Sequence, residues 1–217
     1  MMKIEEVKYQ DVDTILTFCQ KLVVPDYQRR FTWGRNEVNA FYNDIKELVR
    51  DEHFIGSILL ISSPETSDLY ASHEIVDGQQ RIVSIFLMLK ALVKYYYDND
   101  RIEYSTELSD TYLHTKRPGK DSIVKLNVNS RDSASYGSIL RDQEGHDGKM
   151  LKAYSIFKNE IFKLSPEGVD ELLDKLLHKL KIVLIRTGTK GNAFILFETL
   201  NSFVSTNFRY FRKSFFR

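Results

Sequence analysis

The sequence has little cysteine and no long apolar run. Cys19 is the single cysteine among 217 residues, so no internal disulfide can form and a reducing, cytoplasmic setting is expected. The longest apolar stretch, residues 82–93, is too short to cross a bilayer and is interrupted by Ser84 and Lys90. The first residues show neither an apolar signal core nor a small-residue cleavage site. These absences predict a soluble, cytoplasmic protein without a membrane partner.

The sequence also lacks an excess of charge of either sign. Lys and Arg number 31 and Asp and Glu number 30, which gives a formal net charge of +1. This balance excludes a strongly basic surface that would indicate nucleic acid, although it is compatible with a local basic groove. The five histidines are scattered, without the spacing of a metal cluster. The residues that would bind a metal therefore stay unknown.

Helix and strand patterns cover most of the chain and predict an α+β fold. Apolar periodicity and capping residues predict helices over residues 11–20, 36–50, 79–97, 150–164, 165–180 and 192–201, with Asn36 as the N-cap of the second. An extended segment is predicted over 22–25, and strands over 54–61, 72–76, 123–128 and 181–186. The helix over 79–97 is apolar on most faces and is the predicted core helix. Residues 131–147 are polar and poorly patterned, so we expect a mobile connection there.

The most informative stretch is residues 73–81 (HEIVDGQQR), where a short strand meets a polar turn that opens onto the predicted core helix. Amides at a helix start point outward and the aligned peptide dipoles favour an anion, so this turn suits a phosphate. Gly78 would let a ligand approach the backbone, and Arg81 offers a forked donor for phosphate oxygens. The other polar residues of the turn would bind a metal, a ribose or a water; they are Asp77, Gln79 and Gln80. A turn before a helix also needs no ligand, with Asp77 as its cap, and the residues alone leave both interpretations open.

A second polar segment, residues 24–33 (VPDYQRRFTW), places two arginines among three aromatic rings. Guanidinium groups bind phosphates and aromatic rings stack on bases, so the segment suits a nucleotide. We expect Phe31 and Trp33 mainly as core anchors. In the strand over 54–61, Gly56 would allow another backbone to approach closely.

Four segments, taken in order, resemble the N-terminal domain of the GmrSD-type, modification-dependent restriction endonucleases. They are VPDYQRRFTW (24–33), FIGSILL (54–60), IVDGQQRIVSIFLML (75–89) and LFETLN (196–201), and the match in order and spacing covers residues 23–201. The resemblance implies a fold similar to that of ParB and sulfiredoxin. A small mixed sheet with a central core helix would occupy residues 1–100, followed by a mainly helical extension with a returning strand over 101–201.

The resemblance also implies a site and an activity. The nucleotide-binding residues would be Tyr27, Gln28, Arg29, Gly56, Asp77, Gly78, Gln79, Gln80 and Arg81, with Asp77, Gln80 and Arg81 catalytic. The ligand would be a nucleoside triphosphate, GTP, ATP or another, together with Mg²⁺. In the family this domain is associated with nucleotide binding and hydrolysis, while a separate C-terminal nuclease domain cleaves DNA.

We therefore predict an NTPase module of a phage-defence restriction system that regulates a DNA nuclease and meets DNA through that partner. The alternative is a non-catalytic ParB-like module that binds DNA or protein. A homo-oligomer is compatible with the sequence.

Two features depart from the family pattern. Residues 82–84 (IVS) replace the usual LTT, which removes a hydroxyl near the helix start and weakens the expectation of metal or phosphate coordination there. Residues 202–217 (SFVSTNFRYFRKSFFR) form a basic, aromatic tail in place of the usual continuation. We expect this tail to result from a frameshift or premature stop, which would leave a split-system subunit or an inactive truncated remnant. Binding of the tail to nucleic acid or to a membrane surface is the alternative.

Overall fold

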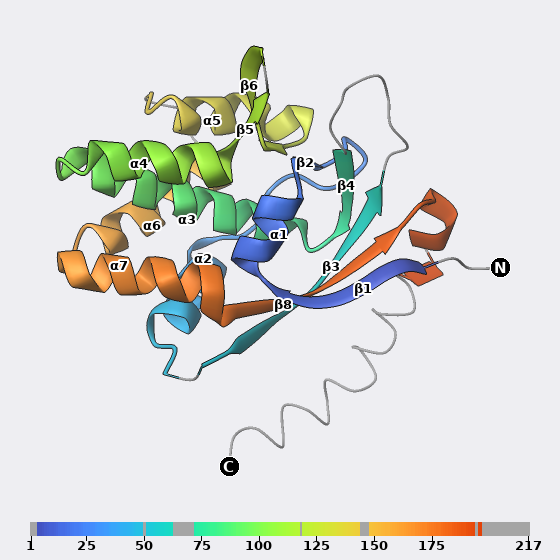
Figure 1. The fold of residues 1–217 in the computed structure, drawn as a ribbon, viewed down its shortest axis with the longest axis horizontal. Coiled ribbons are helices and arrows are strands. Elements are labelled where there is room, and N and C mark those ends of the chain that lie inside the picture. The colour runs from blue at the N-terminus through green and yellow to red at the C-terminus, as the bar shows by residue number, and fades with distance from the viewer. Residues whose placement is uncertain are drawn as a thin grey trace.

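The computed structural model describes residues 4–49, 51–62, 72–117, 119–143, 148–193 and 195–196. Within them, a mixed sheet is packed against a group of helices (Figure 1), which confirms the predicted α+β class. In spatial order its strands are β1 (Ile4–Asp11), β8 (Leu180–Thr187), β3 (His53–Ser62), β4 (Ser72–Asp77), β2 (Lys21–Val23) and β7 (Leu126–Asn127). A separate antiparallel pair is formed by β5 (His114–Arg117) and β6 (Lys120–Val124).

The predicted core helix is confirmed and lies at the centre of the helical layer. The helices are α1 (Val12–Phe18), α2 (Arg35–Lys46), α3 (Gln79–Asp98), α4 (Ile102–Leu108), α5 (Ser130–Leu140), α6 (Lys149–Ile161) and α7 (Pro166–Asp174), with π-helical turns at Ser109–Leu113 and Lys175–Lys179. Every side chain of α3 from Ile82 to Val93 is buried. Packing against α4 and α6 surrounds this apolar helix, which explains why it carries no polar stripe. Among the helices of the described residues, none is both long and apolar enough to cross a membrane.

Strand β8 joins distant parts of the chain. It pairs antiparallel with β1 and parallel with β3. Ile182 and Leu184 are buried in the main core, whereas Ile185 belongs to a smaller apolar cluster with Leu59 and Ile61. The sheet therefore has apolar side chains on both faces. The division into a core over 1–100 and an extension over 101–201 stays a prediction, but β8 of the extension lies within the sheet.

The mobile connection predicted over 131–147 is wrong for its described part. Residues Ser130–Leu140 form α5, whose buried side chains Asp132, Tyr136 and Ile139 recur at helical spacing. The segment contains a buried carboxylate where an apolar residue is usual, so its hydrophobic pattern is weak. Tyr136 and Ile139 of α5 pack into the main apolar core, and the helix also makes polar contacts to a distant segment, described below.

The boundaries of α2 also differ from the prediction. Its N-cap is Gly34, whose N–H donates to Glu37 Oε2 at 2.9 Å, rather than Asn36. Glu37, at the third helical position, thus reaches back to the N-cap amide, as the glutamate of a capping box does. The helix ends at Lys46, so Val49, predicted on the buried stripe, is 96% exposed.

Two strand predictions need correction. The pattern over 123–128 is divided between β6 and β7, which lie in different sheets, and between them Lys125 donates from its buried Nζ to Leu16 O at 2.7 Å and Thr111 O at 2.8 Å. Strand β1 is not predicted by any pattern, because the side chains at its described outer positions, including Val7 and Tyr9, are exposed. The connection over 63–71, the end of the helix predicted over 192–201 and the tail over 202–217 lie outside the described residues.

Candidate functional site

Residues 77–81 join β4 to α3 with Gly78 as the helix N-cap. Gly78 has the left-handed φ of 86°, and a Cβ there would lie 2.8 Å from Ile58 Cγ1 and 3.1 Å from Ser57 O. Only glycine fits both the conformation and the close approach to β3. No side chain caps α3, so Asp77 is not the cap, and the first-turn amides remain available to a ligand.

Arg81 extends from the first turn of α3 toward β3. Its Nη1 donates to Ser57 O at 2.7 Å, and its guanidinium lies against Gly56. Burial lowers the pKa of Arg81, while the nearby Asp77 carboxylate raises it in part. Because an arginine stays protonated in proteins, Arg81 contributes a partly desolvated cation with N–H donors beyond the one used by Ser57.

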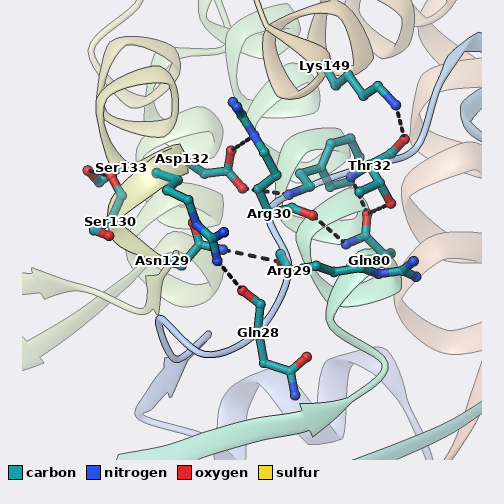
Figure 2. Close-up of polar contacts among 12 residues, drawn as sticks. Gln28, Arg29, Arg30, Thr32, Gln80, Asn129, Ser130, Asp132, Ser133 and Lys149 are labelled. Carbon is teal, nitrogen blue, oxygen red and sulfur yellow. Dashed lines mark hydrogen bonds and ion pairs between the residues drawn. The ribbon is translucent and has the colours of Figure 1, made fainter.

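The opposite side of the site is formed by residues 28–33, the wall segment. Gln79 and Gln80, each 7% exposed, fasten it to α3. Three hydrogen bonds do so. Gln79 Nε2 donates to Arg29 O at 2.6 Å. On the neighbouring residue, Thr32 N donates to Gln80 Oε1 at 2.8 Å and Gln80 Nε2 donates to Arg30 O at 3.3 Å (Figure 2). Both glutamine side chains therefore bind backbone that precedes them by about fifty residues, and they order one side of the site.

The wall segment and the turn enclose a cavity of about 660 Å³, the candidate pocket, which has the size of a small-molecule site. It is lined by Gln28, Arg29, Trp33, Val76, Asp77, Gly78, Gln79, Gln80 and Arg81. Nearly all of the residues predicted to bind nucleotide are thus brought together. Tyr27 and Gly56 are the two that do not line the cavity.

These two residues lie at its margins. Tyr27 donates from its hydroxyl to Glu74 Oε2 at 3.3 Å, and Lys190 Nζ lies 5.4 Å from the centre of its ring. Gly56 contacts the guanidinium of Arg81 but does not itself line the cavity. Beside Tyr27, Gln28 enters the lining and donates from Nε2 to Val76 O at 2.8 Å.

Two cations and one carboxylate line the candidate pocket. Arg29 is exposed, and no described residue hydrogen-bonds or ion-pairs with its guanidinium. Arg81 is the second cation, and Asp77 is the carboxylate of the lining. No group of three or more His, Cys, Asp or Glu residues suited to a metal is found in the described part of the chain. A metal here would have to share Asp77 with oxygen atoms of a ligand.

Trp33 contacts both the apolar core and the candidate pocket. Its ring packs 5.6 Å from that of Phe41 and 6.4 Å from that of Phe31, which is itself buried. It also lines the candidate pocket. Trp33 is therefore a core anchor with one part facing the site.

The sequence patterns missed the support that α5 and α6 give to the wall segment. The contacts of the wall segment include Asn129 Nδ2 to Arg29 O at 3.3 Å, Phe31 N to Asp132 Oδ2 at 2.6 Å, Arg30 Nε to Asp132 Oδ1 at 3.4 Å, Arg131 Nη2 to Gln28 O at 2.7 Å and Lys149 Nζ to Thr32 O at 2.9 Å. Figure 2 shows Asn129 and Asp132 on one side of the wall segment and Gln80 on the other. An Asn at the N-cap of α5 followed three residues later by Asp132 was the available signal for this helix.

The fold and the pocket define a class: an α+β domain with a cation-bearing, ligand-sized site where a strand meets the core helix. Comparison with family models finds that residues 12–203 match the GmrSD restriction endonuclease, N-terminal domain. The chain belongs to this family, which makes it a module of a restriction system and confirms the resemblance carried by the four segments. The search of curated proteins found no match.

Proposed function

We propose that the candidate pocket binds and hydrolyses a nucleoside triphosphate, GTP or ATP, and that this activity regulates a DNA nuclease in a phage-defence restriction system. The observation that carries the proposal is the convergence of Arg29 and Arg81 on one cavity at the start of α3. The two cations come from segments about fifty residues apart, and neither forms an ion pair with a carboxylate of the described residues at salt-bridge distance. A polyanionic ligand would satisfy both.

The start of α3 adds to this attraction. The helix is 20 residues long and lacks a side-chain cap, so its first amides and its dipole, about half an elementary charge, face the cavity. Gly78 keeps the turn free of a side chain. Backbone amides and a forked guanidinium are the donors that bind phosphate oxygens most effectively.

The remaining lining suits the rest of a nucleotide. Trp33 offers an aromatic ring edge or face to a base, and Gln28 offers an amide. Asp77 is the carboxylate that would hold Mg²⁺, since nucleotide sites bind this ion through one or two carboxylates together with phosphate oxygens. A bound Mg²⁺ would neutralise phosphate charge. The donor set of this pocket therefore fits the ion.

The three residues predicted to be catalytic differ in how many of their polar groups are free to contact a ligand. No described residue donates a hydrogen bond to the Asp77 carboxylate, and Arg81 has N–H donors beyond the one that Ser57 O accepts. Gln80 is bonded to the wall segment through both amide atoms, so its contribution to hydrolysis would act through the position of that segment. This favours, as the second candidate function, a non-catalytic ParB-like module that binds nucleotide without turnover while contacting DNA or protein.

Trp33, the only tryptophan of the chain, gives a direct test. ATP and GTP with Mg²⁺ are titrated against the protein, with tryptophan emission and calorimetry as readouts. We expect one of them to bind, and both Arg29→Ala and Arg81→Ala to weaken binding about tenfold, the cost of one charge-assisted contact. Arg101→Ala serves as the control, because Arg101 pairs with Asp170 outside the pocket. Unchanged affinity in both pocket variants would overturn the site assignment.

Turnover is measured separately, as phosphate release with each nucleotide in the presence and absence of modified DNA. Release by the wild type that is lost in Asp77→Ala supports hydrolysis. Nucleotide binding without release under any condition would instead establish the non-catalytic alternative.

A further inference from the structure

The wall segment separates two cavities, and two consecutive arginines face different ones. Arg29 lines the candidate pocket, whereas Arg30 lines a second cavity of about 370 Å³ with Lys149 and Lys152 of α6. The two residues carry the same charge and differ only in position. Which guanidinium reaches the pocket is therefore decided by how the backbone of the wall segment is held.

The buried carboxylate of Asp132 holds that backbone from the side of α5. Asp132 is 4% exposed; its Oδ2 accepts the Phe31 N–H at 2.6 Å, and its Oδ1 lies 3.4 Å from Arg30 Nε. A charged acceptor on a buried amide is among the stronger hydrogen bonds in a protein. The same carboxylate thus fixes the Phe31 amide and retains the Arg30 side chain.

Asn129, 2% exposed, acts on the preceding residue. Its Nδ2 donates to Arg29 O, the carbonyl that also accepts from Gln79 Nε2. The carbonyl oxygen of Arg29 is therefore held from α3 and from the start of α5, while its guanidinium has no partner among the described residues. Among the polar contacts of the described residues, only those to its backbone fix the point from which this side chain extends.

We propose that Asp132, with Asn129, is a positioning residue that directs Arg29 into the candidate pocket and keeps Arg30 out of it. A shift of the wall segment by one residue would exchange the two arginines, and the bond from Phe31 N to Asp132 opposes that shift. The inference rests on the proposed nucleotide binding and deepens it. It makes α5, which comes from the second half of the chain, part of the nucleotide site.

A double-mutant cycle between Asp132 and Arg29 separates positioning from general stabilisation. Asp132→Ala, Arg29→Ala and the double variant are titrated with the nucleotide that the wild type binds, and each is melted. We expect Asp132→Ala to weaken binding about tenfold in the wild-type background and to have no further effect in the Arg29→Ala background. The loss of melting temperature from Asp132→Ala should be the same in both backgrounds.

Two further variants keep the test decisive if Asp132→Ala does not fold. Asp132→Asn retains an oxygen for the Phe31 amide and should bind nucleotide within about threefold of the wild type. Asn129→Ala removes one bond to Arg29 O, and its loss of affinity should likewise vanish without the Arg29 guanidinium. Asp170→Ala is the matched carboxylate control: it loses contacts to Tyr96 and Arg101 far from the pocket, so it should lower the melting temperature without changing affinity.

The outcomes distinguish the two proposals. Equal losses from Asp132→Ala with and without Arg29 would overturn the positioning role while leaving nucleotide binding intact. A wild-type protein that binds no nucleotide would overturn the proposed function and this inference together.

Discussion

Gly56 on β3 lies directly behind the guanidinium of Arg81 on α3. A Cβ built on Gly56 would be 2.5 Å from Arg81 Nη1 and 3.0 Å from Cζ, and Gly56 has a φ of 109°. The sequence predicted Gly56 as a nucleotide-binding residue that admits another backbone. In the structure it admits the side chain of Arg81, so we expect any effect of Gly56 on a ligand to pass through that cation.

Gly56→Ala is expected to displace Arg81 from Ser57 O and to weaken nucleotide binding. The clash and the left-handed backbone should together cost about 1–3 kcal/mol of unfolding free energy. Denaturant titration measures the stability, and Trp33 emission measures the binding. The matched control is Gly119→Ala, since Gly119 has a φ of 66° but nothing within 4 Å of its added Cβ. If both variants bind nucleotide equally well, Gly56 does not act through Arg81.

Gln80→Ala should raise the dissociation constant for nucleotide more than it lowers the turnover of bound nucleotide. The reason is that the Gln80 amide is bonded to the backbone of Arg30 and Thr32 rather than left free for a water. Saturation kinetics of phosphate release separate the two effects. Gln143→Ala, which removes an exposed contact to Arg141, is the control. A fall in turnover at unchanged affinity would instead support a catalytic Gln80.

The features that could be predicted from the sequence are those set by neighbouring residues. A continuous apolar run predicts the core helix α3. An Asp-Gly pair predicts the turn before it, because such a turn needs a residue in the left-handed conformation and Gly78 adopts it. Gly78, Gln79, Gln80 and Arg81 of this turn line one pocket in the structure. All of these depend on a stretch of about twenty residues.

The features that could not be predicted depend on distant partners. Phe31 and Asp132 are 101 positions apart, and no local pattern indicates that a carboxylate in a weakly apolar segment accepts a buried amide. The sequence predicts Gln79 and Gln80 as ligand-binding residues. They do line the pocket, but no local pattern indicates that they also bind backbone atoms of the wall segment. Strand β1 is equally hidden, because its pairing with β8 joins the two ends of the described chain.

Phe86→Ala is expected to destabilise the fold strongly, because Phe86 is fully buried in α3. Loss of the ring from a packed core costs about 3–5 kcal/mol of unfolding free energy. Phe54→Ala, on β3, is the matched control: Phe54 is 54% exposed, and its removal should cost about 1 kcal/mol or less. Denaturant unfolding of both variants measures the difference. Equal costs would contradict the central position of α3.

His73 should make the protein less stable as the pH falls below about 6.5. It is 2% exposed on β4, its ring stacks on Phe18, and its Nδ1 lies 3.4 Å from Ser62 Oγ. Burial lowers the pKa of His73 from 6.5, the Arg186 cation lowers it further, and Glu6 raises it in part. Because the folded pKa lies below the unfolded value, the unfolded chain takes up a proton first as the pH falls. The contribution to stability is therefore complete above pH 6.5 and is lost as the pH falls through the folded pKa.

Unfolding free energies measured as the pH is lowered should fall by at most about 1.4 kcal/mol per pH unit for this one proton. His73→Gln removes the titrating group while keeping a polar side chain, so its profile should be flatter than that of the wild type. His178→Gln is the control, since His178 is exposed on the turn after α7 and should leave the wild-type profile in place. If His73→Gln retains the full slope, the acid sensitivity arises from other groups. Asp11, the N-cap of α1, would act only at lower pH. Burial raises the pKa of Asp11, but hydrogen bonds from Thr14 and Lys181 outweigh this effect and hold the pKa below its usual value.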